Sequence, residues 1–322
     1  MHNYIAVTIG DINGIGIKIL IDLWKKNKIK NFILFTDILI LRKYLKKEKY
    51  NIQLNIINKN MTKSFNNKKL NVYNYKSSSL VDNTYKSLKY SYQFCKKNIC
   101  IGMITLPIRK DLIIKKVNKR FVGHTEYFQK LDKKEYSNMI LFHKKIIITT
   151  LTTHISVKQI ANKISNKNYL MNQIINLHKT LKIDFNIEKP RLIISGLNPH
   201  AGEKGNLGNE EIKYILPIIK KLKNKVNISG PVSPDAMLIK KNLNNYDCFI
   251  FIYHDQALIP FKFISQFSGV NYTGNLDIIR TSPDHGTAYN LKKDKNFSNK
   301  SLINCYNLVK LIYKNRIMNA KS

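Results

Sequence analysis

Short apolar runs alternate with amphipathic stretches through the first third of the chain. Residues 5–9 (Ile-Ala-Val-Thr-Ile) are typical of a buried strand, and after a glycine-containing turn apolar residues recur at helical spacing over residues 19–24. The alternation continues with a predicted strand at residues 32–35, a helix at 38–45 and a strand at 51–57. Strands that alternate with helices favour βαβ units, so we expect an α/β fold with a parallel sheet.

Three more apolar runs in the middle of the chain are each followed by a histidine. The runs are residues 146–150, 191–195 and 248–253, and the histidines are His154, His200 and His254. The carboxyl ends of strands form the ligand crevice of open α/β sheets. Neutral imidazole is a common zinc ligand, and three protein ligands with an open position are typical of a catalytic metal site. No local motif joins the three, so unrelated structural or surface histidines remain an equal alternative.

The composition is that of a globular protein. The chain has 322 residues, of which 43% are hydrophobic and 10% aromatic. It is long enough for one catalytic unit of two lobes over residues 1–322, with lobe boundaries that the sequence leaves open. No apolar run has the length of a membrane span and the N-terminus lacks a signal-peptide pattern, so we expect a cytoplasmic protein.

The four cysteines predict neither a metal knuckle nor a redox pair. Cys95 and Cys100 are close together in the sequence but have unsuitable spacing, and Cys248 and Cys305 are isolated. We therefore expect free, reduced and mostly buried thiols.

The charge is strongly positive. Lysine and arginine number 55 and aspartate and glutamate 20, which gives a net charge of +35. Such a balance can indicate nucleic acid as a partner. However, the lysines are spread along the whole chain beside asparagine and isoleucine, without a zinc-finger spacing or an RNA-binding motif. These residues share A/T-rich codons, so genome composition is the favoured explanation and we expect no nucleic-acid partner.

Three glycine-punctuated segments are candidates for ligand binding. Residues 10–16 follow a strand but match neither a Rossmann nor a Walker A motif, and a tight turn is the stronger interpretation. Residues 198–211 form a polar loop ending in acidic residues, which suit a helix N-terminus. Residues 280–288 place an arginine, threonines and a serine in a predicted loop that could bind phosphate or carboxylate.

Taken in order, these segments resemble the 4-hydroxythreonine-4-phosphate dehydrogenase family of vitamin B6 biosynthesis. The similarity spans nearly the whole chain, and seven motifs in the right order are specific although each alone is weak. The matching motifs are Thr8–Gly16, Gly123–Glu126, Thr152–His154, Gly196–Glu211, Gly230–Asp235, Tyr253–Gln256 and Arg280–Ala288.

The resemblance implies a fold, an assembly and a set of site residues. The fold would be an isocitrate/isopropylmalate-dehydrogenase-like α/β/α fold, two lobes with an active-site cleft between them, in a homodimer with its site at the subunit interface. The cofactors would be NAD or NADP and a divalent metal (Zn, Mg or Co). The implied metal ligands are His154, His200 and His254, with His154 and His200 from one chain and His254 from its partner. The implied substrate residues are His124, Thr125, Lys262, Asn271 and Arg280. Supporting carboxylates would be Asp235 and Asp255, and Asp284, His285, Gly286 and Thr287 would bind the cofactor.

The implied reaction oxidises 4-phosphohydroxy-L-threonine to a 2-amino-3-oxo acid phosphate, which decarboxylates to 3-amino-2-oxopropyl phosphate. The chain departs from the family pattern in its first loop, where Ile12, Ile17 and Lys18 replace two prolines and a glutamate. Arg109-Lys110 replaces the usual Asn-Lys. Two other functions stay open. One is a sibling dehydrogenase acting on another phosphorylated hydroxy acid, and the other is a decayed scaffold that binds nucleic acid.

Overall fold

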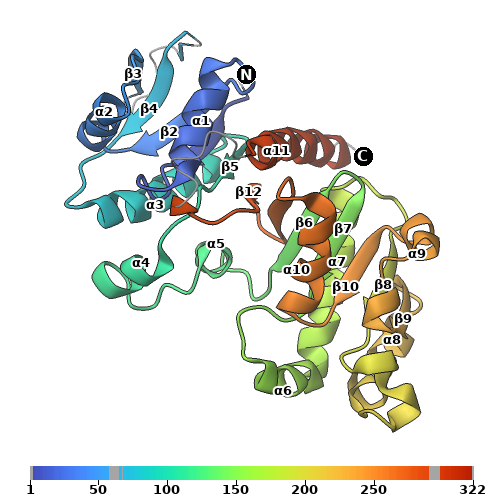
Figure 1. Ribbon diagram of the computed structural model, residues 1–322. Helices are drawn as coiled ribbons and strands as arrows, with labels where there is room; N and C mark the ends of the chain where they lie inside the picture. The colour runs from blue at the N-terminus through green and yellow to red at the C-terminus, as the bar shows by residue number, and fades with distance from the viewer. Residues whose placement is uncertain (1–2, 58–64, 67, 290–297, 321–322) are drawn as a thin grey trace. The chain divides into compact units, whose positions relative to one another are not determined.

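The chain divides into two compact units, each made of two stretches of sequence. Unit 1 comprises Met1–Lys133 and Leu276–Tyr313, and unit 2 comprises Lys134–Asn275 and Lys314–Ser322. The computed structural model describes residues 3–57, 65–66, 68–289 and 298–320 (Figure 1).

Unit 1 contains a parallel sheet with helices, as its strand–helix alternation predicts. The sheet order is β3-β4-β2-β1-β5-β12, and the strand pairs are parallel. Its elements are β1 (Ile5–Thr8), α1 (Ile15–Lys25), β2 (Phe32–Thr36), α2 (Ile38–Lys47), β3 (Leu54–Ile57), β4 (Leu70–Asn74), α3 (Leu80–Lys96), β5 (Gly102–Ile104), α4 (Lys110–Lys116), α5 (His124–Leu131), β12 (Arg280–Pro283) and the first turns of α11 (Lys300–Asn319).

Side-chain caps fix where two of these helices begin. The Asp37 carboxylate accepts a hydrogen bond from the Leu39 N–H at 2.9 Å and begins α2. The Ser79 hydroxyl accepts from the Asp82 N–H at 3.1 Å and begins α3. Each cap satisfies an N–H group that has no partner inside the helix. Ser79, Leu80 and Val81, at the start of α3, line a cavity of unit 1.

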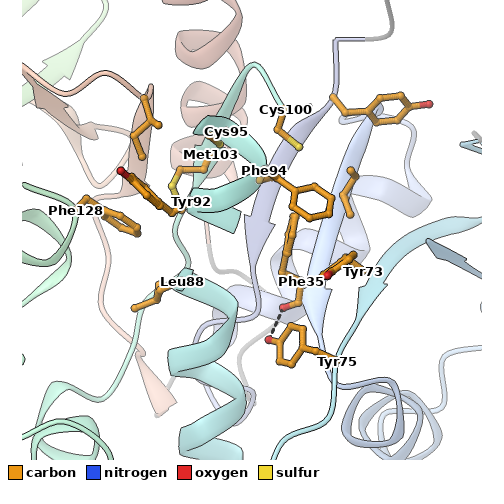
Figure 2. Close-up of a cluster of buried hydrophobic side chains, with 14 of the residues drawn as sticks. Phe35, Tyr73, Tyr75, Leu88, Tyr92, Phe94, Cys95, Cys100, Met103 and Phe128 are labelled. Atoms are coloured by element: carbon orange, nitrogen blue, oxygen red, sulfur yellow. Dashed lines mark hydrogen bonds between the residues drawn. The ribbon is translucent and has the colours of Figure 1, made fainter. Parts of the chain in front are cut away.

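An aromatic cluster fills the core of unit 1 on the α3 side of the sheet (Figure 2). Phe35 of β2 packs edge-on against Phe94 of α3, with ring centroids 4.9 Å apart. The Tyr75 hydroxyl donates to the Phe35 carbonyl at 3.3 Å, so the only polar atom of the Tyr75 side chain has a hydrogen-bond partner. Cys95 and Cys100 belong to this cluster, and all four cysteines are free and buried, which confirms that expectation.

Unit 2 contains a mixed sheet in the order β11-β6-β7-β10-β8-β9. Strand β6 is antiparallel to both β11 and β7, whereas the other pairs are parallel. Its elements are β6 (Asn138–His143), β7 (Ile146–Thr150), α6 (Ile160–Ser165), α7 (Lys167–Ile183), β8 (Arg191–Ser195), α8 (Leu216–Leu222), β9 (Asn227–Val232), α9 (Lys240–Asn245), β10 (Cys248–Phe251), α10 (His254–Ser265), β11 (Val270–Gly274) and the last turns of α11.

The antiparallel strand departs from the parallel sheet that the alternation predicts. Only Lys144 and Lys145 separate β6 from β7, and Lys144 has a left-handed φ of 55°. A connection of two residues can join only antiparallel strands, and such hairpins favour positive φ. The three strands followed by histidines, β7, β8 and β10, keep the expected parallel arrangement. Within the described residues, no helix has the length and apolar character needed to cross a membrane.

Candidate active site

The three predicted metal ligands follow three adjacent strands of unit 2. His154 comes after β7, His254 begins the helix directly after β10, and His200 lies in the turn after β8. Strands β7, β10 and β8 are neighbours and parallel, so all three histidines emerge from one edge of the sheet. This is the carboxyl edge, where α/β proteins bind their ligands.

His154 and His254 of the same chain form a pair. Their ring centroids lie 5.9 Å apart, with the ring planes inclined at 39°. Two imidazoles that bind one ion through bonds of about 2.0–2.1 Å place their centroids roughly 5–6 Å apart. The pair therefore fits a shared ion. Within the described residues of a single chain, no three His, Cys, Asp or Glu side chains gather as a metal site.

The backbone is left-handed at two of the three histidines. The φ of His154 is 52° and that of His200 is 51°, values that are uncommon for residues other than glycine. Such conformations persist where the surrounding structure holds them, and they concentrate at functional sites. Their position at the candidate ligands supports a role for both loops in binding.

A single glutamine joins the strand ends that carry His200 and His254. The Gln256 side-chain oxygen accepts hydrogen bonds from the Ile252 N–H at 2.8 Å and the Ser195 hydroxyl at 3.1 Å. Its side-chain nitrogen donates to the Gly196 carbonyl at 3.0 Å. Because Gln256 bridges the end of β10 to the end of β8, it fixes the spacing between the two loops.

The loop after β8 folds around a buried carboxylate. Residues His200 to Lys204 all have left-handed φ, so the segment is one left-handed turn. The Glu211 side chain is 1% exposed and accepts from the Leu197 and Asn198 N–H groups at 2.7 and 2.8 Å. The sequence predicted only that the acidic pair here would suit a helix dipole; Glu211 instead turns inward to the loop.

The two predicted supporting carboxylates lie in unit 2 and are exposed. The Asp255 carboxylate lies 3.1 Å from Nδ1 of His254, which leaves Nε2 of that ring for other partners. The Ser233 hydroxyl donates a short hydrogen bond to Asp235, and this bond lowers the pKa of that carboxyl, with backbone N–H groups and His200 contributing. The influence of His200 indicates that Asp235 lies near the left-handed turn.

The predicted substrate residues are divided between the units. His124, Thr125 and Arg280 belong to unit 1, and Lys262 and Asn271 belong to unit 2. In unit 1, Nε2 of His124 is buried and has no hydrogen-bond partner among the described residues. Burial, and then the charges of Arg280 and Lys110, hold the pKa of His124 well below its usual range. The ring is therefore neutral at pH 7 and has a polar atom to offer to a ligand.

Arg280 is buried in a strand and does not lie in the loop that the sequence predicted. It begins β12, opposite Met103 of β5, and is 2% exposed. Its guanidinium donates to the Thr105 hydroxyl from Nε at 3.0 Å and from Nη2 at 2.7 Å. Burial lowers the pKa of Arg280 to about 10, partly offset by Cys305 and Glu126. A buried cation of this kind is a strong candidate for holding an anionic group.

In unit 2 the two remaining substrate candidates lie on regular elements. Lys262 is half-buried on α10, with Nζ 5.7 Å from the centre of the Phe267 ring. Asn271 lies on β11, and its Oδ1 is buried without a hydrogen-bond partner among the described residues. A buried amide oxygen without a partner is costly and fits a ligand that donates a hydrogen bond.

A cavity of about 500 Å³ lies in unit 1 at the carboxyl ends of β1 and β5. The chain leaves β1 for β2 on one side and later returns to β5 on the other, so this is the switch point where α/β sheets bind nucleotides. Asp11, Arg109, Lys116 and Tyr289 are among the lining residues.

The predicted cofactor residues, Asp284, His285, Gly286 and Thr287, lie next to this cavity in sequence but do not line it. The Thr287 carbonyl accepts from the Ile15 N–H at 3.1 Å, and a Cβ on Gly14 would lie 2.9 Å from it. Gly14 thus allows two loops to approach closely. A Cβ on Gly286 would meet open space, which leaves room for a ligand.

Sequence reasoning missed Glu211 and Gln256, which lie in recognised motifs without an assigned role. Their partners are distant: Gln256 contacts residues 60 and 61 positions earlier. The only sequence signal for a role was that each residue belongs to a motif that also contains a candidate metal ligand, His200 for Glu211 and His254 for Gln256. Lys110, whose charge acts on His124, was likewise noted only as part of a changed dipeptide.

Comparisons with known proteins agree with the resemblance. Residues 28–309 match the sequence model of the pyridoxal phosphate biosynthetic protein PdxA. The 4-hydroxythreonine-4-phosphate dehydrogenase of Wigglesworthia glossinidia brevipalpis is 33% identical over 310 residues, which cover 92% of this chain and 93% of that protein. The protein of the same name from Sulfurihydrogenibium sp. is 40% identical over 192 residues, covering 59% of this chain and 58% of that protein.

Solved structures show the same relationship. The crystal structure of 4-hydroxythreonine-4-phosphate dehydrogenase from Klebsiella pneumoniae matches with a TM-score of 0.82 and 27% identity, covering 97% of this chain and 99% of that chain. A putative enzyme of this name from Salmonella typhimurium has a TM-score of 0.84 and 25% identity, covering 97% and 100%. The α/β fold class is confirmed, and the chain belongs to the family of the pyridoxal phosphate biosynthetic protein PdxA.

Proposed function

We propose that this chain is an NAD(P)-dependent and divalent-metal-dependent 4-hydroxythreonine-4-phosphate dehydrogenase of pyridoxal phosphate biosynthesis. The names of its relatives support the reaction class. The observation that carries the proposal is the pairing of the His154 and His254 rings at one strand edge. A zinc-type catalytic site needs three such ligands.

The substrate, 4-phosphohydroxy-L-threonine, is a β-hydroxy acid that carries an amine and a phosphate. Its oxidation at C3 gives a β-keto acid, which loses CO₂ to give 3-amino-2-oxopropyl phosphate. A divalent cation would polarise the C3 oxygen as a Lewis acid while nicotinamide accepts the hydride. The protein's own side chains must therefore hold two anionic groups of the substrate and align C3.

His124, Thr125, Arg280, Lys262 and Asn271 would bind the substrate. Arg280 is buried and supplies a planar donor that suits phosphate or carboxylate. Neutral His124 offers its buried Nε2, and Asn271 offers its buried Oδ1, which suits the substrate amine. These roles match the polarity of each group to a different part of the substrate.

The metal would be held by His154, His200 and His254, with Asp255 fixing the His254 ring through Nδ1. The resemblance implies that two subunits of a homodimer share the site. The implied division takes His154 and His200 from one chain and His254 from its partner. Since the His154 and His254 rings of one chain lie as a pair, we propose a different division, in which these two come from one chain and His200 from its partner. Asp235, close to His200, would be a further supporting carboxylate.

The dinucleotide would occupy the cavity at the β1–β5 switch point, beside the Asp284–Thr287 loop. Arg109 and Lys116 supply positive charge for its phosphates, and Tyr289 and Ile12 supply apolar surface for a ring. The choice between NAD and NADP, the metal (Zn, Mg or Co) and the cytoplasmic location remain predictions.

A nicotinamide-reduction assay tests the function directly. We expect 4-phosphohydroxy-L-threonine to drive reduction of NAD⁺ or NADP⁺ with release of CO₂, and a chelator to abolish both until a divalent metal is restored. Turnover of another phosphorylated hydroxy acid, with none of this substrate, would favour the sibling dehydrogenase instead. Salt-sensitive retention on DNA without any turnover would favour the nucleic-acid-binding scaffold.

The Arg280→Lys variant tests anion recognition in unit 1. A planar donor is replaced by a point charge, so kcat/KM should fall by the equivalent of about 1.5–3 kcal/mol, the worth of a hydrogen bond to a charged group. Arg42→Lys is the matched control, because Arg42 is exposed on α2 and should keep wild-type kcat/KM. Wild-type kcat/KM in a folded Arg280→Lys variant would mean that Arg280 only supports the scaffold.

A further inference from the structure

The left-handed turn that carries His200 is built around the Glu211 carboxylate. One carboxylate oxygen accepts from the Leu197 and Asn198 N–H groups, and the other accepts from Nδ2 of Asn198 at 3.0 Å. The same carboxylate fills the inside of the turn, because a Cβ on Gly202 would lie 2.6 Å from it. Glu211 thus contacts the loop on both sides of His200.

The buried Glu211 carboxylate takes its hydrogen bonds from the loop that carries His200. Glu211 is 1% exposed and forms no ion pair among the described residues. Its three hydrogen-bond donors all belong to residues 197 and 198. A buried carboxylate costs free energy unless hydrogen bonds satisfy it. An apolar side chain could fill the space, but it could not fix the direction of two backbone N–H groups.

We propose that Glu211 is a positioning residue that holds the His200 imidazole in the geometry needed to bind a divalent cation. The inference rests on the proposed function, in which His200 is a metal ligand. His200 is exposed and its backbone is left-handed, so without support the turn would sample other conformations. The hydrogen bonds to Glu211 restrict the chain two and three residues before His200, and the packing of Gly202 restricts it two residues after.

The Glu211→Gln variant of the full-length protein tests this role. Glutamine has nearly the same shape, but in either orientation its amide nitrogen faces a donor, either Nδ2 of Asn198 or the two backbone N–H groups. We expect Zn²⁺ affinity, measured by competition with a chromophoric chelator, to fall about 10–100-fold, as is typical when a group behind a metal ligand is lost. The absorption spectrum of the Co²⁺-loaded protein should also change.

Glu203→Gln is the matched control. It makes the same chemical change in the same turn, at an exposed position, and should keep wild-type Zn²⁺ affinity and the wild-type Co²⁺ spectrum. A residue that merely stabilises the fold would lower the melting temperature of the Glu211→Gln variant and leave the Co²⁺ spectrum unchanged, and that result would overturn the proposal.

A rescue variant keeps the test valid if Glu211→Gln fails to fold. Nδ2 of Asn198 also donates to Glu210 at 2.8 Å, so combining Asn198→Asp with Glu210→Gln and Glu211→Gln reverses every donor and acceptor of this trio. We expect Zn²⁺ affinity and the Co²⁺ spectrum to return toward wild type. Affinity in the folded triple variant as weak as that of His200→Ala would contradict the proposal.

His200→Ala in the same assay tests the role of His200 as a metal ligand separately from the positioning role of Glu211. If this variant binds Zn²⁺ like wild type, the metal assignment in the proposed function fails regardless of Glu211. If His200→Ala weakens binding and a folded Glu211→Gln variant does not, the metal assignment stands and only the positioning role is lost.

Discussion

A mixture of two inactive variants should regain about a quarter of wild-type activity if a two-fold dimer shares the metal site as we propose. One variant carries His200→Ala, and the other carries both His154→Ala and His254→Ala. In a mixed dimer, one site receives His154 and His254 from the first chain and His200 from the second, so it is complete. Half of the dimers formed by random mixing are mixed, and one of their two sites works.

The experiment requires that the two variants be unfolded and refolded together, with native mass spectrometry to show that heterodimers form. NAD(P)⁺ reduction with the phosphorylated substrate measures the recovered activity. Each variant refolded alone should stay inactive, because both of its sites lack at least one ligand. Recovery of activity in the mixture would agree with the pairing of the His154 and His254 rings within one chain.

A second mixture distinguishes the alternative divisions. Here His154→Ala combined with His200→Ala is mixed with His254→Ala. Activity in this mixture alone would mean that His254 comes from the partner, as the family resemblance implies, and would contradict the division that we propose. Failure of both mixtures in proven heterodimers would contradict both divisions and would leave two arrangements: all three ligands in a single chain, or His154 alone from the partner.

Removing Asp184 should destabilise unit 2 by about 3–5 kcal/mol, because a mostly buried arginine would lose its charge partner. Asp184 is 3% exposed and accepts from Nε of Arg316 at 2.6 Å and from Nη2 at 3.2 Å. The Tyr272 hydroxyl of β11 also donates to this carboxylate. The network therefore joins the end of α7, strand β11 and the last turns of α11.

Urea unfolding of Asp184→Ala, compared with wild type, measures the loss. Arg191→Ala is the control, since it breaks the exposed Arg191–Asp247 ion pair at 2.9 Å and should change the free energy of unfolding by less than about 1 kcal/mol. An equal effect in both variants would show that burial of the Asp184–Arg316 pair contributes nothing beyond an ordinary surface contact.

Much of the fold is visible in the sequence because burial leaves a local pattern. Buried strands read as continuous apolar runs. Residues 146–150 and 191–195 are strands as expected, and the predicted run 248–253 contains the shorter strand β10 (Cys248–Phe251). Their histidines could be noticed for the same local reason, since each follows its strand within a few residues. The ordered motifs were also sufficient to identify the family, and the match of residues 28–309 to the PdxA sequence model confirms it.

Local patterns were less reliable where a residue's environment is made by distant segments. Arg280 looked like a loop residue because it precedes a polar, proline-containing stretch, yet pairing with β5 makes it the buried start of a strand. Glu211 looked like a surface acid at a helix start, yet the loop from residue 197 folds back over it. Strand β5 is far from Arg280 in the sequence, and the loop from residue 197 is more than ten residues from Glu211. Neither partner therefore affects the local hydrophobic pattern around these two residues.

By itself, then, the sequence determined the α/β class, the buried strands, the free cysteines and the set of candidate ligands, because each follows from residue type and spacing over a few positions. The tertiary structure alone decided which of these residues meet. The order of strands brings β7, β10 and β8 together, so that His154 pairs with His254 and Gln256 spans to Gly196. Sheet order depends on the summed packing of distant segments, and no stretch of local sequence contains that information.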